Sequence, residues 1–397
     1  MERWKRNLIF LWVAQFFSLS GFSFSLPFGP FYLEELGITD PARLRIWSGL
    51  FASSAGLSMA IMTPFWGYLA DRIGKKPMTL RASLGGTIAL LGIGLAQSPE
   101  MVIAFRVLQG AFTGTVTAYL TLVIAETPKA RLGLVMGLMN AAVFLGNSVA
   151  PLLGGLFADA FGYRSSFFVA AGFLLASFLL ALLFVQEDFS PGPKTSFSFF
   201  SDTKSLLLVS GVLPIVGMIF LYGIARTIQR PILPLFVQQL TTTGQGVATQ
   251  TGLVTSAAGI ASVVAGILFG TLADRGKPMT IGMICTFAAA FMSGTIVLSE
   301  TTWHLTILYF LADFAIGGLE PILKLLLARI VPVSQRGSAF GIIGSARAFG
   351  WFTGSLSGGI IAAFLGLSAV FVVTAGLFMF MGLLLSLFRR QKKGLKE

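Results

Sequence analysis

The stretch Gly67-Tyr-Leu-Ala-Asp-Arg72 returns almost unchanged as Gly270-Thr-Leu-Ala-Asp-Arg275, and each copy lies between two long apolar segments. The copies are separated by about half of the chain, which indicates an internal duplication. Around them the 397 residues are 55% hydrophobic and only 11% charged. That is about half the charged fraction of an ordinary soluble domain. The repeated unit is therefore predicted to be a bundle of membrane helices.

Twelve segments are long and apolar enough to cross a bilayer, since a helical span needs about 20 mostly apolar residues. They cover residues 7–33, 45–70, 77–97, 101–126, 133–160, 164–186, 206–239, 247–273, 278–299, 303–330, 337–362 and 367–389. An open sheet is excluded because lipid offers no partners for its edge N–H and C=O groups. We expect an all-α membrane protein of 12 transmembrane helices in two pseudo-symmetric six-helix bundles, residues 1–186 and 206–397, joined by a cytoplasmic linker at 187–205.

Basic residues set the expected orientation. With a cytoplasmic N-terminus, the inner segments hold most of the Lys and Arg, and the outer segments hold only Arg43, Arg45 and Arg164. Positive residues near helix ends are retained on the cytoplasmic side during insertion. We therefore expect a multi-pass protein of the inner, cytoplasmic membrane with both termini inside. The net charge of +12 is interpreted as this topology signal with some attraction to anionic membrane lipids, and not as a nucleic-acid site.

Scarce reactive residues argue against an enzyme. Cys285 is the one cysteine and His304 the one histidine, so an intramolecular disulfide and a Cys/His metal site are excluded. The sequence has no G-x-x-x-x-G-K-[ST] phosphate loop, and transport cannot draw on ATP hydrolysis within this polypeptide. We find no convergent nucleophile, metal or base cluster. The expectation is a protein that is not an enzyme and that carries no cofactor.

The duplication extends beyond the hexapeptide. Pro-Phe-Gly-Pro at 27–30 matches Pro-Ile-Leu-Pro at 231–234, and the small-residue pattern at 146–155 returns at 350–359. The three matches keep nearly the same offset. Two parallel halves are therefore predicted to face one another across a pseudo-two-fold axis along the membrane normal.

These motifs resemble those of the major facilitator superfamily along essentially the whole chain. Residues 67–76 resemble its signature loop between the second and third helices, and Arg106-Val-Leu-Gln-Gly110 resembles its fourth-helix motif. Residues 146–155 are similar to the fifth-helix motif of its antiporters, with Ala150 where Gly is usual. Within this superfamily, the sequence looks most similar to multidrug exporters of the drug:proton antiporter-1 branch. The resemblance implies alternating access, a small-molecule substrate and protons as the coupling ion.

The signature loop and its second copy are expected to act as gates, and the fifth-span motif is expected to form a seal, with helix packing alone as the alternative. Gly67 is predicted to allow a close helix approach, and Asp71 can accept hydrogen bonds from a helix N-terminus or pair with Arg72 or Arg131. The expected gating residues are Gly67, Asp71, Arg72, Arg131, Asp274 and Arg275. Small residues of the fifth span permit intimate helix contact, and a proline bends the helix. These residues, which the resemblance assigns to a seal between the halves, are Gly146, Ala150, Pro151, Gly154 and Gly155.

Charges inside the spans are the sharpest functional indicators, because each costs at least about 2.5 kcal/mol near the bilayer centre. The candidates are Arg106, Arg226, Arg230, Asp313, Glu320, Lys324 and Arg347. Other ionisable residues lie close enough to helix ends to reach water and are discounted. They are Glu34, Glu35, Glu126, Asp159 and Arg329.

Asp313 and Glu320 are the two deepest acids, and their spacing of seven places them on one face of the tenth helix. A carboxylic acid in an apolar interior can bind and release a proton near physiological pH, as proton coupling requires. Lys324, four residues beyond Glu320, favours a structural salt bridge as the alternative. Asp313 has no basic partner on its own helix. The resemblance implies a part for Arg106 in proton transfer, with a static hydrogen bond as the alternative.

Arg226 and Arg230 form a like-charged i, i+4 pair that requires anions nearby. Glu34, Glu35 or Asp313 are candidate partners, and an anionic group of the substrate is the other reading. Aromatic walls suit chemically varied apolar ligands, although packing is the alternative for each ring. The predicted substrate cavity holds Phe28, Tyr32, Phe112, Tyr119, Tyr222, Arg226, Arg230 and Lys324.

The leading hypothesis is a monomeric secondary exporter in which a small amphipathic compound leaves the cell as protons enter. Uptake or release of an anionic metabolite on the same fold is the first alternative, suggested by the excess of buried Arg over acids. A lipid flippase is the second alternative.

Overall fold

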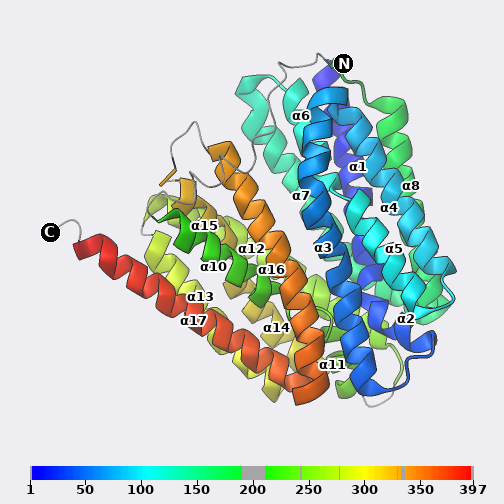
Figure 1. Ribbon diagram of the computed structural model, residues 1–397, viewed down its shortest axis with the longest axis vertical. Helices are drawn as coiled ribbons and strands as arrows, with labels where there is room; N and C mark the ends of the chain where they lie inside the picture. Colours follow the sequence, from blue (N-terminus) through cyan, green and yellow to red (C-terminus); the bar gives the residue numbers. More distant parts are fainter. Residues whose placement is uncertain are drawn as a thin grey trace. The chain divides into compact units, whose positions relative to one another are not determined.

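The structure is a computed structural model, and it describes residues 2–189, 211–241, 244–276, 278–328, 330–331 and 336–394. Every regular element in these ranges is a helix (Figure 1). The elements are α1 (Arg3–Ser25), η1 (Leu26–Phe28), α2 (Gly29–Glu35), α3 (Pro41–Ile73), α4 (Lys75–Leu95), α5 (Pro99–Phe112), α6 (Thr115–Glu126), η2 (Lys129–Arg131), α7 (Leu132–Phe161), α8 (Tyr163–Phe184), α10 (Val212–Thr227), α11 (Leu233–Leu240), α12 (Val247–Arg275), α13 (Pro278–Thr295), η3 (Ile296–Leu298), α14 (Thr302–Gly317), α15 (Leu319–Ala328), α16 (Arg336–Leu365) and α17 (Leu367–Gly394).

Ten helical segments within the described residues are long and apolar enough to cross a membrane. They are Arg3–Glu35, Pro41–Ala70, Lys75–Leu95, Pro99–Glu126, Leu132–Phe161, Tyr163–Phe184, Val247–Ala273, Pro278–Leu298, Gly341–Leu365 and Leu367–Arg389. The predicted seventh and tenth spans are instead divided into shorter helices. The first of these breaks precedes Pro231, whose ring nitrogen cannot donate a helical hydrogen bond, and the second falls at Gly317-Gly318.

The helices belong to two units, which are described separately. Unit 1 comprises Met1–Asp40, Ser54–Phe197 and Gly244–Ser256, and unit 2 comprises Pro41–Ser53, Ser198–Thr243 and Ala257–Glu397. Two helices are shared by the units. The first residues of α3 belong to unit 2 and the rest to unit 1, whereas α12 begins in unit 1 and continues in unit 2.

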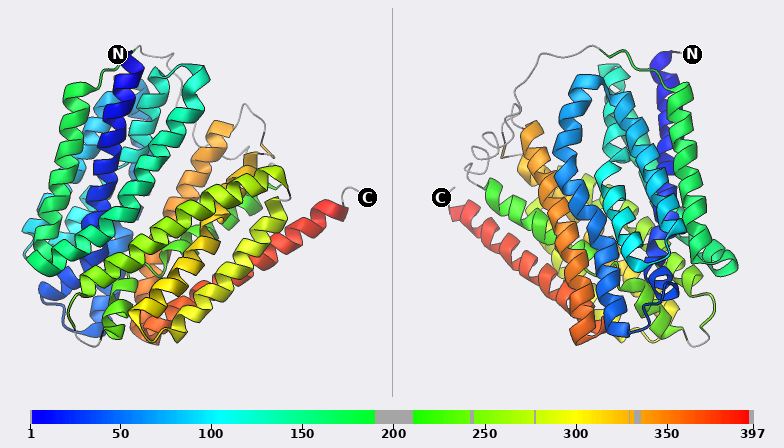
Figure 2. Two further views of the ribbon diagram at one scale, coloured as in Figure 1. Left: turned by 180° about the vertical axis from the view of Figure 1, so that it is seen from behind. Right: turned by 45° about the vertical axis from the view of Figure 1, so that its right-hand side comes forward.

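In unit 1, α1 is the central helix and packs between α7 and α8 (Figure 2). Glycine permits the close approach of α7 to α1. A methyl group added to Gly146 would lie 2.9 Å from the Leu19 side chain and 3.1 Å from the carbonyl oxygen of Phe16. One added to Gly154 would overlap the carbonyl oxygen of Phe24. The α1–α7 interface is therefore a backbone-to-backbone contact that larger residues would prevent.

In unit 2, α10 packs against α16, and α13 runs beside α17 (Figures 1 and 2). Glycine again forms the first interface. A methyl group on Gly350 would lie 2.6 Å from the Phe220 carbonyl oxygen, and one on Gly358 would overlap the Ile228 carbonyl oxygen. Gly354 meets Ile224 in the same way at 2.6 Å. The α16 glycines therefore repeat the pattern of α7.

The two interfaces correspond residue by residue. Gly146 and Gly350 lie 204 positions apart, and so do the residues that they meet, Phe16 and Phe220. The pair Gly154–Phe24 is related to Gly358–Ile228 by the same offset. The repeats of sequence are thus also repeats of helix packing within each unit.

We expect Gly154→Ala to destabilise the protein by about 1–3 kcal/mol, the usual cost of overpacking, because the obstructing atom is backbone and cannot turn aside. Gly137→Ala in the same helix is the matched control, since no described atom lies within 4 Å of a methyl group there. Apparent melting temperatures of the purified variants provide the measurement. Equal melting temperatures for the two variants would contradict the close contact.

Candidate functional site

Asp313 is the best-enclosed acid of unit 2, with 2% of its surface exposed. It extends from α14 and forms an ion pair with Arg226, in the last turn of α10. Ser262 of α12 completes a ring, because its hydroxyl donates to Asp313 Oδ1 at 3.1 Å and accepts from Arg226 Nη2 at 2.8 Å. Three helices are thus joined by a carboxylate, a guanidinium and a hydroxyl that compensate one another away from water.

Glu320 belongs to a second ion cluster of unit 2. Its Oε1 lies 2.7 Å from Lys324 Nζ, four residues along α15, and 3.0 Å from Arg347 Nη1 of α16. The salt bridge predicted between Glu320 and Lys324 is present. The Glu320 side chain is 27% exposed, so this cluster is less enclosed than the ring around Asp313.

A helix break separates the two acids, and this corrects the prediction that they share one face of one helix. Asp313 is in α14 and Glu320 in α15, with Gly317 and Gly318 at the junction. A methyl group on Gly317 would lie 2.8 Å from the Ser262 carbonyl oxygen, and one on Gly318 would lie 2.6 Å from the Phe269 ring. Because of this close approach of α12, each acid has its own set of partners.

The predicted Arg226–Arg230 pair is also divided by a helix end. Arg226 lies in α10, which ends at Thr227, whereas Arg230 follows in the turn before Pro231. Of the three acids considered as partners, Asp313 binds Arg226. The Arg230 side chain is exposed and forms no ion pair with a described residue. The pair is therefore not a repulsive stack on one helix face.

Unit 1 has a polar group at the corresponding place. Arg106, 3% exposed, extends from α5 and donates to Gln109 Oε1. Gln109 lies 204 positions before Asp313, and each lies about one turn before the end of its helix. In unit 1 the break lies between α5 and α6, where Gly114 has a φ of 120°. Both repeats thus carry a buried polar group beside a broken helix, a place where transporters bind substrates and ions.

Three of the predicted cavity residues are core residues in this structure. Phe28, Tyr32 and Tyr119 are almost completely buried. The Tyr32 hydroxyl donates to the carbonyl oxygen of Ile93 at 3.0 Å, and the Tyr119 hydroxyl lies 2.6 Å from that of Ser177. Their hydroxyl groups are used in packing between helices of unit 1, so this burial does not support a place in an open cavity.

The other predicted aromatic residues differ from these three. Phe112 of unit 1 is half-buried, lies tilted against Trp66 and covers Gly85. Tyr222 of unit 2 is buried in α10, one turn before Arg226. Tyr222 therefore remains next to the ion ring, whereas Phe112 lies beside the break between α5 and α6.

The signature loop differs from the prediction in two respects. A methyl group on Gly67 would meet no described atom within 4 Å, so Gly67 does not provide a close contact here. The Arg72 guanidinium lies 4.3 Å from the Tyr68 ring centroid, and Arg131 is exposed. The side chains of three predicted gating residues are outside the described part of the structure. They are Asp71, Asp274 and Arg275.

Glu187 is an acid that the sequence did not single out. Its carboxylate accepts from the backbone N–H groups of Lys75 at 2.8 Å and of Lys76 at 2.7 Å, and so caps the start of α4. Gly74, with a φ of 100°, must stay small because an added methyl group would lie 2.8 Å from Glu187. The segment after α8 is thereby attached to the end of the signature loop.

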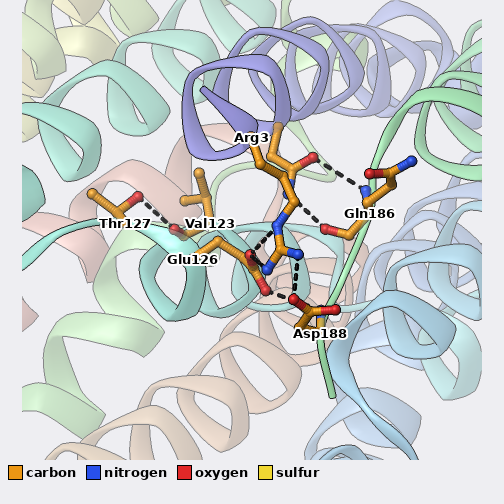
Figure 3. A network of polar contacts seen from close by, with 7 residues as sticks. Arg3, Val123, Glu126, Thr127, Gln186 and Asp188 are labelled. Atoms are coloured by element: carbon orange, nitrogen blue, oxygen red, sulfur yellow. Dashed lines mark hydrogen bonds and ion pairs between the residues drawn. The ribbon is translucent and has the colours of Figure 1, made fainter. Parts of the chain in front are cut away.

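A neighbouring network attaches the same segment to α1 and α6 (Figure 3). Arg3 of α1 contacts Glu126 Oε2 at 2.6 Å and also pairs with Asp188. The Asn7 amide donates to the Gln186 carbonyl oxygen at 2.6 Å. Glu126 was discounted as an acid near a helix end, but it has a structural partner in Arg3.

The antiporter-type motif of α7 faces two directions. Gly146 and Gly154 meet α1, whereas a methyl group on Gly155 would overlap the Ala248 carbonyl oxygen at the start of α12. Pro151 lies within α7, and its carbonyl oxygen blocks a methyl group on Gly252 of α12. Ala150 is buried, so the Gly-to-Ala difference at this position is accommodated.

Asp159, also discounted from the sequence, reinforces this α7–α12 contact. Its carboxylate accepts from the N–H groups of Ala248 at 3.2 Å and Thr249 at 2.7 Å, and from the Thr249 hydroxyl at 2.5 Å. A carboxylate at the first N–H groups of a helix satisfies donors that the helix leaves free. Only the contact with α12 reveals this role, because the partner is 89 residues away.

The ring around Asp313 predicts strong energetic coupling. We expect Arg226→Gln alone to destabilise the protein by about 3–5 kcal/mol, because it leaves a buried carboxylate without compensation. The double variant Arg226→Gln/Asp313→Asn is expected to cost less than the two single changes added together. A double-mutant cycle on thermal stability measures this, with the exposed pair Glu2 and Lys5 as the control that shows little coupling. Additive effects at Arg226 and Asp313 would contradict the ring.

Comparison with known proteins identifies the family of this chain. The sequence profile of the Major Facilitator Superfamily matches residues 11–216 and 215–397. The multidrug resistance protein MdtG of Citrobacter koseri is 35% identical over 378 residues, which cover 95% of this chain and 93% of that protein. MdtG of Serratia proteamaculans is 35% identical over 94% of this chain and 91% of that protein. The resemblance found in the motifs is confirmed.

Solved structures show the same fold at low sequence identity. The nucleoside transporter NupG superposes with a TM-score of 0.77 at 15% identity, over 97% of this chain and 98% of that one. The human organic anion transporter MFSD10 (TETRAN) gives a TM-score of 0.69 at 18% identity, over 97% and 100% of the chains. One explanation accounts for the helices that are long enough to span a membrane, for the motifs and for these matches. The chain is a multi-pass membrane protein that belongs to the Major Facilitator Superfamily.

Proposed function

We propose that this protein is a secondary active exporter that moves small amphipathic compounds, including drugs, out of the cell in exchange for protons. The proposal includes twelve spans in two six-helix bundles, residues 1–186 and 206–397, with 187–205 as the linker. It also includes an inner-membrane location with both termini in the cytoplasm and a monomeric state. Similarity to the MdtG multidrug resistance proteins over almost the whole chain supports the substrate class. The described residues offer no group of metal ligands, and no enzymatic reaction is proposed.

The observation that carries the proposal is the ring of Asp313, Arg226 and Ser262. A proton that binds the Asp313 carboxylate forms an O–H bond and removes the negative charge opposite Arg226. The guanidinium then loses its counter-charge, and the link between α10, α12 and α14 weakens. Protonation can thus be converted into a change of helix contacts, which a coupled transporter requires.

Release of the proton to the other side restores the carboxylate and the ring. Movement of one positive charge across 100 mV supplies about 2.3 kcal/mol, which is enough to bias such a two-state element severalfold. Glu320, with two cations within ion-pair distance, serves as a second acid that holds α15 to α16. We place Arg106 in a matching role in unit 1, where it fixes the polar group beside the α5–α6 break.

We propose that substrate binds beside the ring, against Tyr222, Arg226, Arg230 and Lys324. Tyr222 supplies an aromatic surface one turn from Arg226, and Arg230 is an exposed cation of the same segment. Apolar area with few directional groups accommodates chemically varied compounds. The glycine-rich contact of α7 with α12, capped by Asp159, and the signature loop capped by Glu187 are proposed as the gates.

A second candidate is transport of an anionic metabolite on the same fold. It is favoured by the cations of unit 2: Arg226, Lys324 and Arg347 pair with only two acids, Asp313 and Glu320, and Arg230 forms no ion pair with a described residue. Competition in a binding assay separates the candidates. Displacement of a bound probe by cationic and neutral amphipathic drugs supports export of drugs, whereas displacement by small organic anions alone supports the second candidate.

We expect Asp313→Asn to abolish gradient-driven export while some substrate binding is retained, because the amide cannot exchange a proton. Proteoliposomes that contain a pH-sensitive dye measure substrate-dependent proton flux, and a binding assay measures the retained affinity. Glu300→Gln is the control, because it makes the same carboxylate-to-amide change at an exposed residue outside the ring. Full active transport by Asp313→Asn would remove Asp313 from the mechanism. Absence of substrate-dependent proton flux in the unmodified protein would reject antiport.

A further inference from the structure

Arg81 is a cation inside unit 1 that the proposed mechanism does not use. It extends from α4, six residues after the helix begins and therefore about 9 Å along the helix axis. Its guanidinium carbon lies 3.9 Å from the centroid of the Trp66 ring of α3. The ring is held in place, since Trp66 Nε1 donates to the Ala111 carbonyl oxygen at 2.7 Å. The Arg81 guanidinium therefore lies over a fixed aromatic surface.

The charge of Arg81 is not compensated by the described residues. Its Nε and Nη1 atoms are enclosed and have no hydrogen-bond acceptor among them. Three other guanidinium groups of the helices do have acceptors: Arg226 binds Asp313, Arg347 binds Glu320, and Arg106 binds Gln109. An ionised group without an acceptor is costly in an apolar interior, and the aromatic ring offers only part of the compensation.

The Arg81 side chain lies beside the break between α5 and α6. The side chain as a whole is half-buried. It is directed at the break between α5 and α6, where a methyl group on Gly114 would lie 3.9 Å from Arg81 Nη2. The break replaces a turn of helix by the extended residue Thr113 and by Gly114, whose φ is 120°. Three helices thus surround a planar cation at a place where regular backbone structure stops.

We propose that Arg81, positioned by Trp66, binds an oxyanion, either a phosphate or a carboxylate group. Guanidinium groups recognise such groups through charge and directed N–H donors, and a stacked guanidinium is already oriented for the contact. Two sources share this chemistry: the headgroup of an anionic phospholipid and a free anion from solution. The site lies in unit 1 and involves none of the residues of the Asp313 ring, so it does not depend on proton antiport.

The test uses the full-length purified chain in an uncharged detergent at constant ionic strength. Its melting temperature is followed while inorganic phosphate or dioctanoyl phosphatidylglycerol is added, with dioctanoylglycerol as the probe without a phosphate. We expect a saturable rise in melting temperature with an oxyanion probe, and its midpoint concentration to increase at least about tenfold in Arg81→Gln. A rise with both oxyanion probes identifies a general oxyanion site, and a rise with the lipid alone identifies the headgroup as the ligand.

Arg72→Gln is the matched control, because Arg72 also stacks on an aromatic ring, that of Tyr68, but is exposed to solvent. In Arg72→Gln, the oxyanion probe is expected to raise the melting temperature by as much as in the unmodified protein. Without any probe, Arg81→Gln is expected to melt no lower than the unmodified chain, since an uncompensated charge is removed; a purely structural arginine would give a lower value. Trp66→Phe keeps the charge of Arg81 but alters the ring that positions it. The midpoint concentration of the probe is therefore expected to increase severalfold.

Three results overturn the proposal. They are no rise with either oxyanion probe, an unchanged rise in Arg81→Gln, and an equal loss of the rise in Arg72→Gln, which would indicate a general effect of surface charge. If Arg81→Gln does not fold, Arg81→Lys and Trp66→Phe decide in its place. Both retain a positive charge, so unchanged midpoints in these two variants also reject the site.

Discussion

Compensation of charge in an apolar interior is the constraint on which the arrangement of this protein depends. Removing a carboxylate and a guanidinium from water is costly, and their mutual attraction offsets the cost only with good geometry and further hydrogen bonds. The ring of Asp313, Arg226 and Ser262 meets this condition by drawing on three helices. Unit 2 can bury these side chains only if they contact one another. The same requirement makes the ring sensitive to any event that alters one charge.

Close helix contact is the second feature that supports the sites. Glycines of α7 and α16 bring these helices against the backbones of α1 and α10, and the contacts correspond across an offset of 204 residues. Glycines also allow the breaks at Gly114 and at Gly317-Gly318, beside which the polar groups of the two repeats lie. One ancestral arrangement has therefore diverged into a neutral partner, Gln109, in one repeat and an acid, Asp313, in the other. The acids that we propose for proton exchange, Asp313 and Glu320, therefore lie in unit 2.

The corrections to the sequence-based expectations have a common cause. Asp313 and Glu320 were expected on one helix face because spacing was read as if the helix were continuous, but the helix is interrupted between them, at the glycines that α12 approaches closely. Asp159 was discounted because acids near helix ends commonly face water, and Glu187 was not singled out at all. In the structure each instead accepts from the first N–H groups of another helix, α12 and α4. The hydroxyl groups of Tyr32 and Tyr119 form hydrogen bonds between helices. The aromatic character of these residues alone does not indicate this role.

The sequence by itself determined the class of architecture, since apolar length, scarce charge and the repeated motifs are local properties that any stretch of chain displays. It also indicated the salt bridge of Glu320 with Lys324, four residues apart on one helix. Only the tertiary structure decided that Arg226 is the partner of Asp313, that Asp313 and Glu320 lie in separate helices, and that Arg81 lies over Trp66. These pairings join residues far apart in the chain, as with Ser262 and Asp313 at a separation of 51, and depend on how helices pack. Packing of that kind is a property of the assembled helices, and no single segment encodes it.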